Sequence, residues 1–304
     1  MTAAAASARR ARCVQRLIVT ADDFGAALEV NEAVETAHRA GILTAASLMV
    51  SGAAADDAVA RARRNPNLRV GLHLVLIEGC PVLPPDCISR LVDSSGSFRR
   101  DMAAMGALFA TSGEARRQLA AEIGAQFEAF RATGLILDHC NAHKHYHLHP
   151  LIGSLIASIG RRFGLRAARV PLEPVAVLRK IEPSTPRMPS LAIAPWALLL
   201  RRRFRAAGLF TGDRVFGLQW SGAMTRDRLC GLIAHLPPGT SELYLHPATA
   251  PYPGCAPGYR YREELEALTA PEVAAACHRR AVELGGFGDF ASPRAEDASL
   301  HRAA

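Results

Sequence analysis

Four of the eleven histidines alternate with other residues in one short segment, Asn141 to Pro150. They are His143, His145, His147 and His149. In an extended chain this spacing places all four imidazoles on one side. The apolar run 135–137 just before the segment predicts a buried strand, and Pro150 suits the first turn of the next helix. Imidazoles at the carboxyl end of a strand favour metal binding or acid/base chemistry over a solvated or chance cluster.

Side chains with the same kind of chemistry follow three other predicted strands. Asp22 and Asp23 follow residues 16–21, His73 lies in 68–74, and His246 follows 241–245. The carboxyl ends of parallel strands converge on one face of a barrel, so we expect these side chains to lie together. An aspartate before a helix is usually an N-cap, but capping does not explain all of these positions at once.

One carboxylate and two imidazoles are a suitable ligand set for a catalytic divalent metal ion with positions left for water and substrate. Since neighbouring side chains in a strand point apart, one aspartate would bind the ion and the other would act as a base on bound water. Zn²⁺, Mg²⁺ or another ion fits this set, and so does the facial triad of non-haem iron oxygenases. A non-catalytic metal-binding protein is the alternative from another class, although it leaves Asp22 beside Asp23 without a role.

Strands and helices alternate along the chain, without internal repeats or a linker. Predicted strands cover 16–21, 43–50, 68–74, 135–137, 165–171, 214–219, 241–245 and 287–290. Helices are predicted at 27–40, 56–64, 114–132, 150–163, 225–235, 260–268 and 271–284. This alternation predicts an α/β fold with a single irregular (β/α) barrel, TIM-barrel-like, of about seven parallel strands. We expect the barrel domain over residues 15–290, between a disordered N-terminal tail, 1–14, and a polar C-terminal tail, 291–304.

Two segments interrupt this rhythm. Residues 77–112 are rich in Pro, Gly, Ser and Asp, which predicts a loop or lid over the active-site face. Residues 174–213 are predicted to be irregular. Within them, 193–204 is apolar in its first half and ends in the basic run Arg201, Arg202 and Arg203. It fits a core helix with a solvated end as well as a short helix that contacts a membrane surface or an apolar substrate.

The net charge of +8 is carried by arginine rather than lysine. Nucleic acid, anionic lipid or a GC-rich genome would each explain this charge, but no nucleic-acid motif is present, so we expect no nucleic-acid partner. The seven cysteines are scattered without a CxxC pair and indicate reduced thiols. No signal peptide or membrane-spanning run is recognised, so the sequence predicts a cytoplasmic protein, soluble or peripheral at the inner membrane.

Six motifs in this chain resemble those of the YdjC/ChbG-like carbohydrate deacetylases. They are TADDFG at 20–25, GLHL at 71–74, the histidine segment, RVP at 169–171, LHP at 245–247 and ELEALT at 264–269. The resemblance extends from Leu17 to about Phe290. Within the family, the chain is most similar to the hopanoid-biosynthesis-associated deacetylases called HpnK. The histidine segment, residues 217–225 and APW at 194–196 carry this closer similarity.

The resemblance implies an irregular barrel that removes acetyl from an N-acetylated sugar with one divalent metal ion, Mg²⁺ or Zn²⁺. The residues that match the metal ligands are Asp23, His73 and His143. Asp22 matches the catalytic base, and His246 would protonate the leaving amine or stabilise the oxyanion. The residues expected to bind or orient the substrate are His145, His147 and Arg169. The pattern departs from the family at Asn141, where many members carry an aspartate that could tune a ligand histidine.

The similarity to HpnK implies a glycolipid substrate. This would be an N-acetylglucosaminyl hopanoid such as N-acetylglucosaminyl bacteriohopanetetrol, deacetylated to the glucosaminyl form in hopanoid side-chain biosynthesis. Such a substrate agrees with peripheral membrane contact through 193–204. Soluble chitooligosaccharides are the alternative, although a groove for them would be lined by aromatic residues, which make up only 6% of this chain. The sequence leaves the oligomeric state open, a homodimer included.

Overall fold

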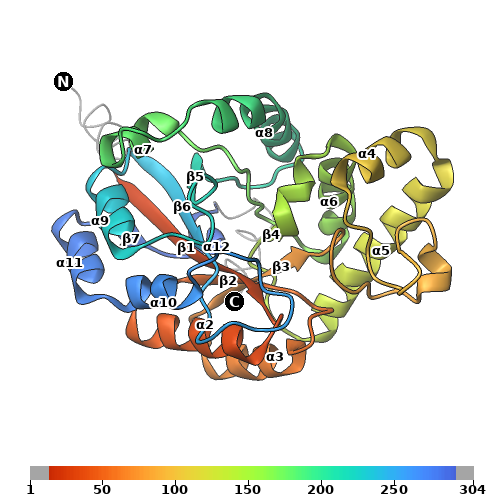
Figure 1. The fold of residues 1–304 in the computed structure, drawn as a ribbon, viewed down its shortest axis with the longest axis horizontal. Helices are drawn as coiled ribbons and strands as arrows, with labels where there is room; N and C mark the ends of the chain where they lie inside the picture. Colours follow the sequence, from red (N-terminus) through yellow and green to blue (C-terminus); the bar gives the residue numbers. More distant parts are fainter. Residues whose placement is uncertain (1–13, 292–304) are drawn as a thin grey trace, which may run out of the picture.

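A curled parallel sheet forms the centre of the computed structural model, which describes residues 14–291. Its strand order is β4-β3-β2-β1-β6-β5, and β7 pairs with the beginning of β1 (Figure 1). The strands are β1 (Gln15–Phe24), β2 (Ala45–Leu48), β3 (Arg69–Leu74), β4 (Cys140–Ala142), β5 (Arg214–Phe216), β6 (Gly239–Leu245) and β7 (Glu283–Leu284). This architecture confirms the predicted α/β, TIM-barrel-like fold.

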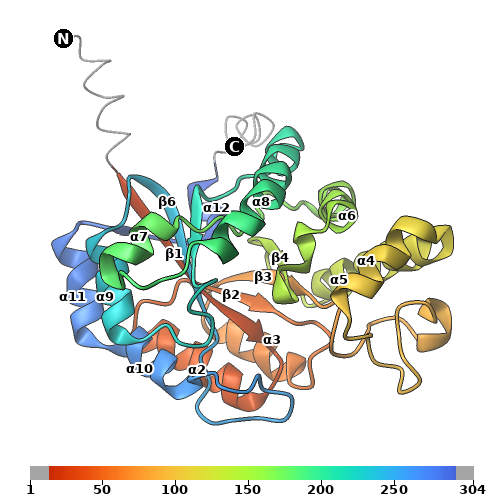
Figure 2. The same cartoon turned by 45° about the horizontal axis from the view of Figure 1, so that its top comes forward.

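Helices surround the sheet and occupy most of the sequence between the strands. The α-helices are α2 (Leu28–Ala40), α3 (Ala55–Arg64), α4 (Met102–Thr111), α5 (Gly113–Ala132), α6 (Pro150–Gly160), α7 (Val175–Ile181), α8 (Met188–Ala206), α9 (Arg226–Ala234), α10 (Tyr261–Thr269), α11 (Pro271–Arg279) and α12 (Phe287–Phe290). Short 3₁₀ turns are η1 (Pro85–Ile88), η2 (His143–Leu148) and η3 (Arg161–Phe163). As Figures 1 and 2 show, α4, α5 and α6 gather beyond β3 and β4, whereas α9 and α11 lie at the opposite end.

The central strand and the long helices follow directly from their residue patterns. All of β1 from Leu17 to Phe24 is buried, as expected for a parallel strand covered on both faces. In α5 the buried residues recur every three or four positions, which gives one core-facing side. The predicted start of α6 at Pro150 is confirmed, and the His149 side chain accepts a hydrogen bond from the Leu151 amide as an N-cap.

The strand predicted at 135–137 is wrong by a few residues. Ile136 is 89% exposed, and the chain enters the sheet only afterwards, where the Asp138 amide donates to the Val70 carbonyl. The strand in this part of the structure is β4, Cys140–Ala142. Three apolar residues are too short a run to distinguish a strand from the surface connection that links α5 to β4.

The extended conformation predicted for the histidine segment is also wrong. Residues 143–148 form the turn η2, in which Lys144 and His145 have φ angles of 52° and 53°. The alternating histidines therefore do not share one face. His149 packs its ring against Phe109 and Tyr146, away from the other imidazoles in the segment.

The remaining differences concern the second half of the chain. Residues 165–171 form isolated bridges to Cys140 and Phe210 rather than a regular strand. The segment 174–213 is not irregular, because it contains α7 and α8. The last strand is β7, and the Phe287–Phe290 region predicted as a strand is the single turn α12. Residues 1–13 and 292–304 lie outside the described part, so the division into two tails and a barrel domain stays a prediction.

Candidate active site

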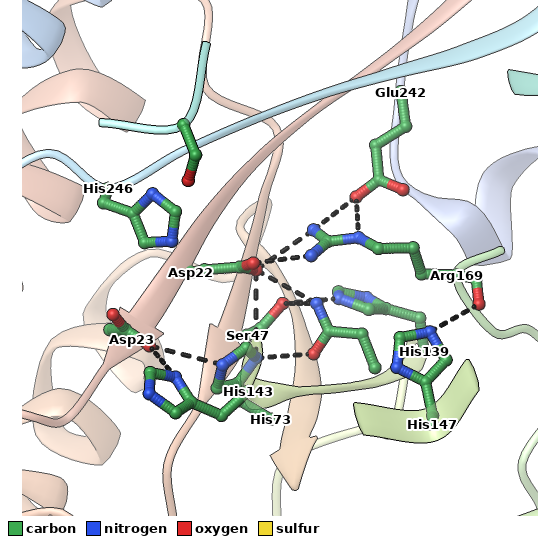
Figure 3. A network of polar contacts seen from close by, with 12 residues as sticks. Asp22, Asp23, Ser47, His73, His139, His143, His147, Arg169, Glu242 and His246 are labelled. Atoms are coloured by element: carbon green, nitrogen blue, oxygen red, sulfur yellow. Dashed lines mark hydrogen bonds and ion pairs between the residues drawn. The ribbon is translucent and has the colours of Figure 1, made fainter. Parts of the chain in front are cut away.

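Three side chains from different strand ends meet in what we call the Asp23 cluster: Asp23, His73 and His143. Their ligand atoms all lie within 4.8 Å of one another. His73 Nε2 and His143 Nδ1 each lie 3.2 Å from Asp23 Oδ1 (Figure 3). Burial opposes charge on both partners, but the facing side chains prevail: the pKa of Asp23 is lowered and that of His143 is raised.

A bulge in β1 brings Asp22 and Asp23 into the same cavity. The register between β1 and β2 shifts between Ala21 and Phe24, and Asp23 has a φ of 61°. Aspartate is among the few residues that enter this left-handed region readily. Both aspartates line one cavity, and the division of roles between them stays a prediction.

The hydrogen bonds of Asn141 define the tautomer of His73. The Asn141 amide nitrogen donates to Asp22 Oδ1 and to Ser47 Oγ, each at 3.0 Å. Its carbonyl oxygen therefore faces His73 Nδ1 at 2.7 Å, and that nitrogen must carry the proton. His73 Nε2 is buried without a hydrogen bond, 3.2 Å from the carboxylate oxygen of Asp23.

This arrangement fits a divalent cation. A neutral imidazole presents a nitrogen lone pair to the carboxylate oxygen 3.2 Å away, and a cation bound between the two atoms stabilises that arrangement. The Asp23 cluster offers one oxygen and two nitrogen ligands, and the carbonyl of Asn141 orients one ligand imidazole from behind. Asn141 thus supports His73 through its carbonyl and also donates to Asp22, which an ionised carboxylate at this position could not do.

Arg169 holds the second aspartate. Its guanidinium contacts both oxygens of Asp22 and also donates to Glu242 Oε1. Burial by itself raises the pKa of Asp22, but Arg169 and His73 outweigh it and hold that pKa well below its usual range. Asp22 is therefore an ionised carboxylate beside the Asp23 cluster.

A buried polar network supports these residues from behind (Figure 3). Ser47 Oγ contacts His139 Nε2 at 3.0 Å, and His139 Nδ1 contacts Asp138 Oδ2 at 2.9 Å. Asp138 in turn accepts the amides of Phe287 and Gly288. The turn α12 is thereby linked through side chains to Asn141 and the floor of the site.

His246 lies across the cavity from the histidine segment, at the end of β6. Its backbone amide donates to Glu264 Oε2 at 2.5 Å, and its ring packs against Tyr244 and Tyr259. Burial lowers the pKa of His246, although Asp23 and Asp22 act in the opposite direction. The imidazole is therefore mainly neutral near pH 7, and its Nδ1 is buried without a partner.

These groups share a cavity of about 950 Å³. One wall comes from the segment 77–112 through residues such as Glu78, Ser97 and Phe98, and Glu78 forms an ion pair with Lys144. The segment predicted to be a loop or lid thus contributes to the wall, although it also contains α4. Four tyrosines also line the cavity: Tyr244, Tyr252, Tyr259 and Tyr261.

The chain is similar in sequence to known proteins over most of its length. Residues 16–279 match the family model described as YdjC-like protein. The chain belongs to the YdjC-like family. It is 32% identical to the carbohydrate deacetylase of Geobacillus stearothermophilus, over 90% of this chain and 97% of that protein. The carbohydrate deacetylase of Homo sapiens is also 32% identical, over 92% of each chain.

A solved structure shares the fold of this YdjC-like protein. A protein of Enterococcus faecalis, named as a candidate cellobiose-phosphate cleavage protein, has a TM-score of 0.72 and 22% identity. The match covers 92% of this chain and 100% of that chain. At this identity the likeness shows a common fold.

The structure brings most, but not all, of the predicted site residues to the cavity. Asp22, Asp23, His73, His143, His145 and His246 line it. By contrast, Arg169 is fully buried behind Asp22, and His147 is 1% exposed with Nε2 facing the Arg169 carbonyl. The contacts of Arg169 and His147 favour a supporting position over the direct contact with substrate that was expected.

Several residues of this YdjC-like site were not singled out as functional from the sequence. Glu242 is a carboxyl group inside the buried strand β6, and such a residue indicates a buried charge partner, here Arg169. Glu264 belongs to the ELEALT motif, but that motif carried no predicted role. No sequence pattern pointed to Ser47 or His139, because they contact each other across the sheet and are far apart in the chain.

Proposed function

We propose that this YdjC-like protein is a metal-dependent hydrolase that removes the acetyl group from an N-acetylated amino sugar. The observation that carries the proposal is the Asp23 cluster beside a second ionised carboxylate, Asp22, and the imidazole of His246 in one cavity. The carbohydrate deacetylases that are 32% identical over nearly the whole chain support it. An iron oxygenase or a metal-storage protein has no need for Asp22.

In this proposal Asp23, His73 and His143 hold one divalent ion, Zn²⁺ or Mg²⁺. Such an ion polarises an amide carbonyl and lowers the pKa of water, so that even a weak base can accept the proton. The donor set does not distinguish the two metals, although two imidazoles favour zinc over magnesium.

In the proposed reaction, Asp22 and His246 carry out the proton transfers. Asp22 accepts the proton of the attacking water, because its carboxylate is ionised and lines the cavity. Arg169 and Asn141 keep that carboxylate in one orientation. His246 then relays the proton that Asp22 has taken from the water to the sugar nitrogen as the C–N bond breaks. The products are acetate and the free amine.

For the substrate we propose an N-acetylglucosaminyl hopanoid, as in the HpnK deacetylases. The apolar residue Ile193 of α8 lines the same cavity, which suits a sugar attached to a lipid. Peripheral contact with the inner membrane, a cytoplasmic location and a homodimer stay predictions.

A soluble chitooligosaccharide is the second candidate, and one observation favours it. Four of the five tyrosines in the chain line the cavity, with ring centroids of Tyr252 and Tyr259 lying 5.4 and 5.6 Å from that of Tyr261. Aromatic side chains are the surfaces on which sugar rings pack. Most of the tyrosines of the chain thus lie where a sugar would bind.

Acetate release by the metal-reconstituted protein tests both proposals. N-acetylglucosaminyl bacteriohopanetetrol and N,N'-diacetylchitobiose are offered side by side. Release from the lipid alone supports the hopanoid, and release from chitobiose alone supports the second candidate. Asp22→Asn is expected to bind metal and lose turnover, whereas His73→Ala loses both. Metal binding without release from either substrate would contradict the deacetylase.

A further inference from the structure

The exposed apolar side chains of this protein are concentrated on one helix. Among residues 14–291, nine large apolar side chains are exposed, and five belong to the first twelve positions of α8. They are Met188, Leu191, Trp196, Leu198 and Leu199. The other four are scattered singly, which is normal for a protein surface, whereas a contiguous apolar patch marks an interaction site.

The two faces of α8 differ in their surroundings. Ala197, Leu200 and Phe204 are at most 2% exposed and pack into the core. Residues 188, 191, 195, 199 and 202 recur at spacings of three or four and are all exposed, so they form an outer face. The helix is held in place by its inner face, and its apolar outer face has no partner within the described chain.

The charge around this outer face is of one sign. The sequence contains no Asp or Glu from residue 183 to residue 212, but five arginines. Arg203 donates to the Pro150 carbonyl and to Ser154, and Arg205 contacts Asp213. Arg201 and Arg202 have no ion-pair partner among residues 14–291. A partner for this face must therefore accept apolar side chains and carry negative charge.

We infer that the outer face of α8 docks on the surface of an anionic lipid bilayer. Leucine, methionine and a half-exposed tryptophan beside arginine form the composition of interfacial helices, and each arginine near an anionic bilayer strengthens binding. A second copy of this chain fits less well, because a two-fold contact through α8 would bring arginines together without a carboxylate on the helix. None of the described helices has the length and apolar composition to cross a bilayer.

The docking face and the cavity share α8. Ile193 lines the cavity, and Gln219 Nε2 donates to the Pro186 carbonyl and to Ser190 Oγ near the start of the helix. The residue before Gln219, Leu218, also lines the cavity. Docking therefore brings the cavity rim close to the bilayer, where it meets head groups of amphiphiles. Only this last step rests on the proposed function.

Vesicle binding tests the inference. The full chain is sedimented with phosphatidylglycerol/phosphatidylcholine vesicles and with phosphatidylcholine vesicles alone. We expect binding to the anionic vesicles that weakens with salt, and a blue shift of tryptophan emission. Of the two tryptophans, Trp220 is 5% exposed and Trp196 is 53% exposed, so the shift reports on α8. Trp196→Phe should abolish the shift and leave most of the binding.

Matched variants locate the binding face. Leu191→Ser/Leu199→Ser and Arg201→Gln/Arg202→Gln are each expected to weaken binding at least about tenfold. Their controls are Ile136→Ser and Arg117→Gln, exposed residues far from α8 in sequence, which should bind as the parent does. No binding to anionic vesicles, or equal loss in the controls, would overturn the inference. A dimer in solution that the Leu191/Leu199 variant dissociates would also overturn it and assign the face to a second copy.

This test is separate from the test of the reaction. Acetate release from a soluble substrate should be unchanged in both α8 variants, because none of the four substituted residues lines the cavity. If vesicle binding fails while acetate release persists, the docking inference alone is wrong. If binding persists without any acetate release, the proposed reaction is wrong and the docking surface stands.

Discussion

Arg169 forms a bidentate ion pair with Asp22: Nη1 lies 2.5 Å from Oδ2, and Nη2 lies 3.0 Å from Oδ1. Both side chains are almost fully inaccessible, at 0% and 3% exposure. The same guanidinium also contacts Glu242, so two buried carboxyl groups share one cation. The candidate base is thereby fixed in orientation and in charge before any substrate arrives.

Replacing Arg169 should separate stability from turnover. Arg169→Met leaves two buried carboxylates unpaired, so we expect the free energy of unfolding to fall by about 3–5 kcal/mol in urea titrations. Arg169→Lys keeps the charge without the two-point contact. We expect it to fold, bind Zn²⁺ and lose roughly 10- to 100-fold in turnover. Native stability in Arg169→Met would contradict the description of this pair.

The Asp23 cluster predicts stabilisation by metal. Added Zn²⁺ should raise the Tm of the parent protein and restore activity lost to a chelator, because an ion that binds only the folded state stabilises it. Asp23→Asn is the informative variant, since asparagine tolerates the φ of 61° while removing the charge. Its Tm should not respond to Zn²⁺. An equal rise in parent and variant would place the metal elsewhere.

Glu264 should act on the reaction through His246. Its two oxygens accept the amides of Met224 and His246 at 2.9 and 2.5 Å. In Glu264→Gln one acceptor becomes a donor that faces an amide donor, so the backbone after β6 must move. We expect kcat to fall about tenfold while Zn²⁺ affinity is unchanged. Simultaneous loss of metal affinity would indicate general disruption instead of a displaced His246.

The raised pKa of Glu173 should make the free energy of unfolding depend on pH. Burial raises the pKa of this carboxyl group to about 7, against the opposing effect of the amides of Gly217, Leu218 and Gln219 that it accepts. The folded state then binds the proton more tightly than the unfolded state, so stability is lost as pH rises from about 4.5 towards 7. Between pH 4 and pH 8 the loss amounts to roughly 3 kcal/mol.

Glu173→Gln should remove this component. The difference in the free energy of unfolding between parent and variant is measured in urea at pH 4 and pH 8. From pH 4 to pH 8 the parent should lose roughly 3 kcal/mol of stability that the variant does not lose. A difference that does not change with pH would mean that Glu173 is ionised throughout this range.

The spacing of apolar residues in the sequence was sufficient to predict the long helices and strands. The regular apolar spacing of α5 and the buried run of β1 each reflect one element packing against the core, so the local pattern carries the information. Short or mixed runs failed. The apolar run 135–137 has Ile136 exposed and its two leucines only partly buried. The sequence of α8 predicts an irregular segment because its prolines and its two apolar faces obscure the period of a helix.

The sequence by itself determined which residue types gather at the strand ends: Asp22, Asp23, His73, His143 and His246 all reach one cavity. Only the tertiary structure decided their arrangement. The bulge at Asp23, the amide orientation of Asn141 and the position of Arg169 behind Asp22 all depend on contacts between strands. A strand pattern reports which side chains are buried, but backbone register and hydrogen-bond direction are set jointly by segments far apart in the chain.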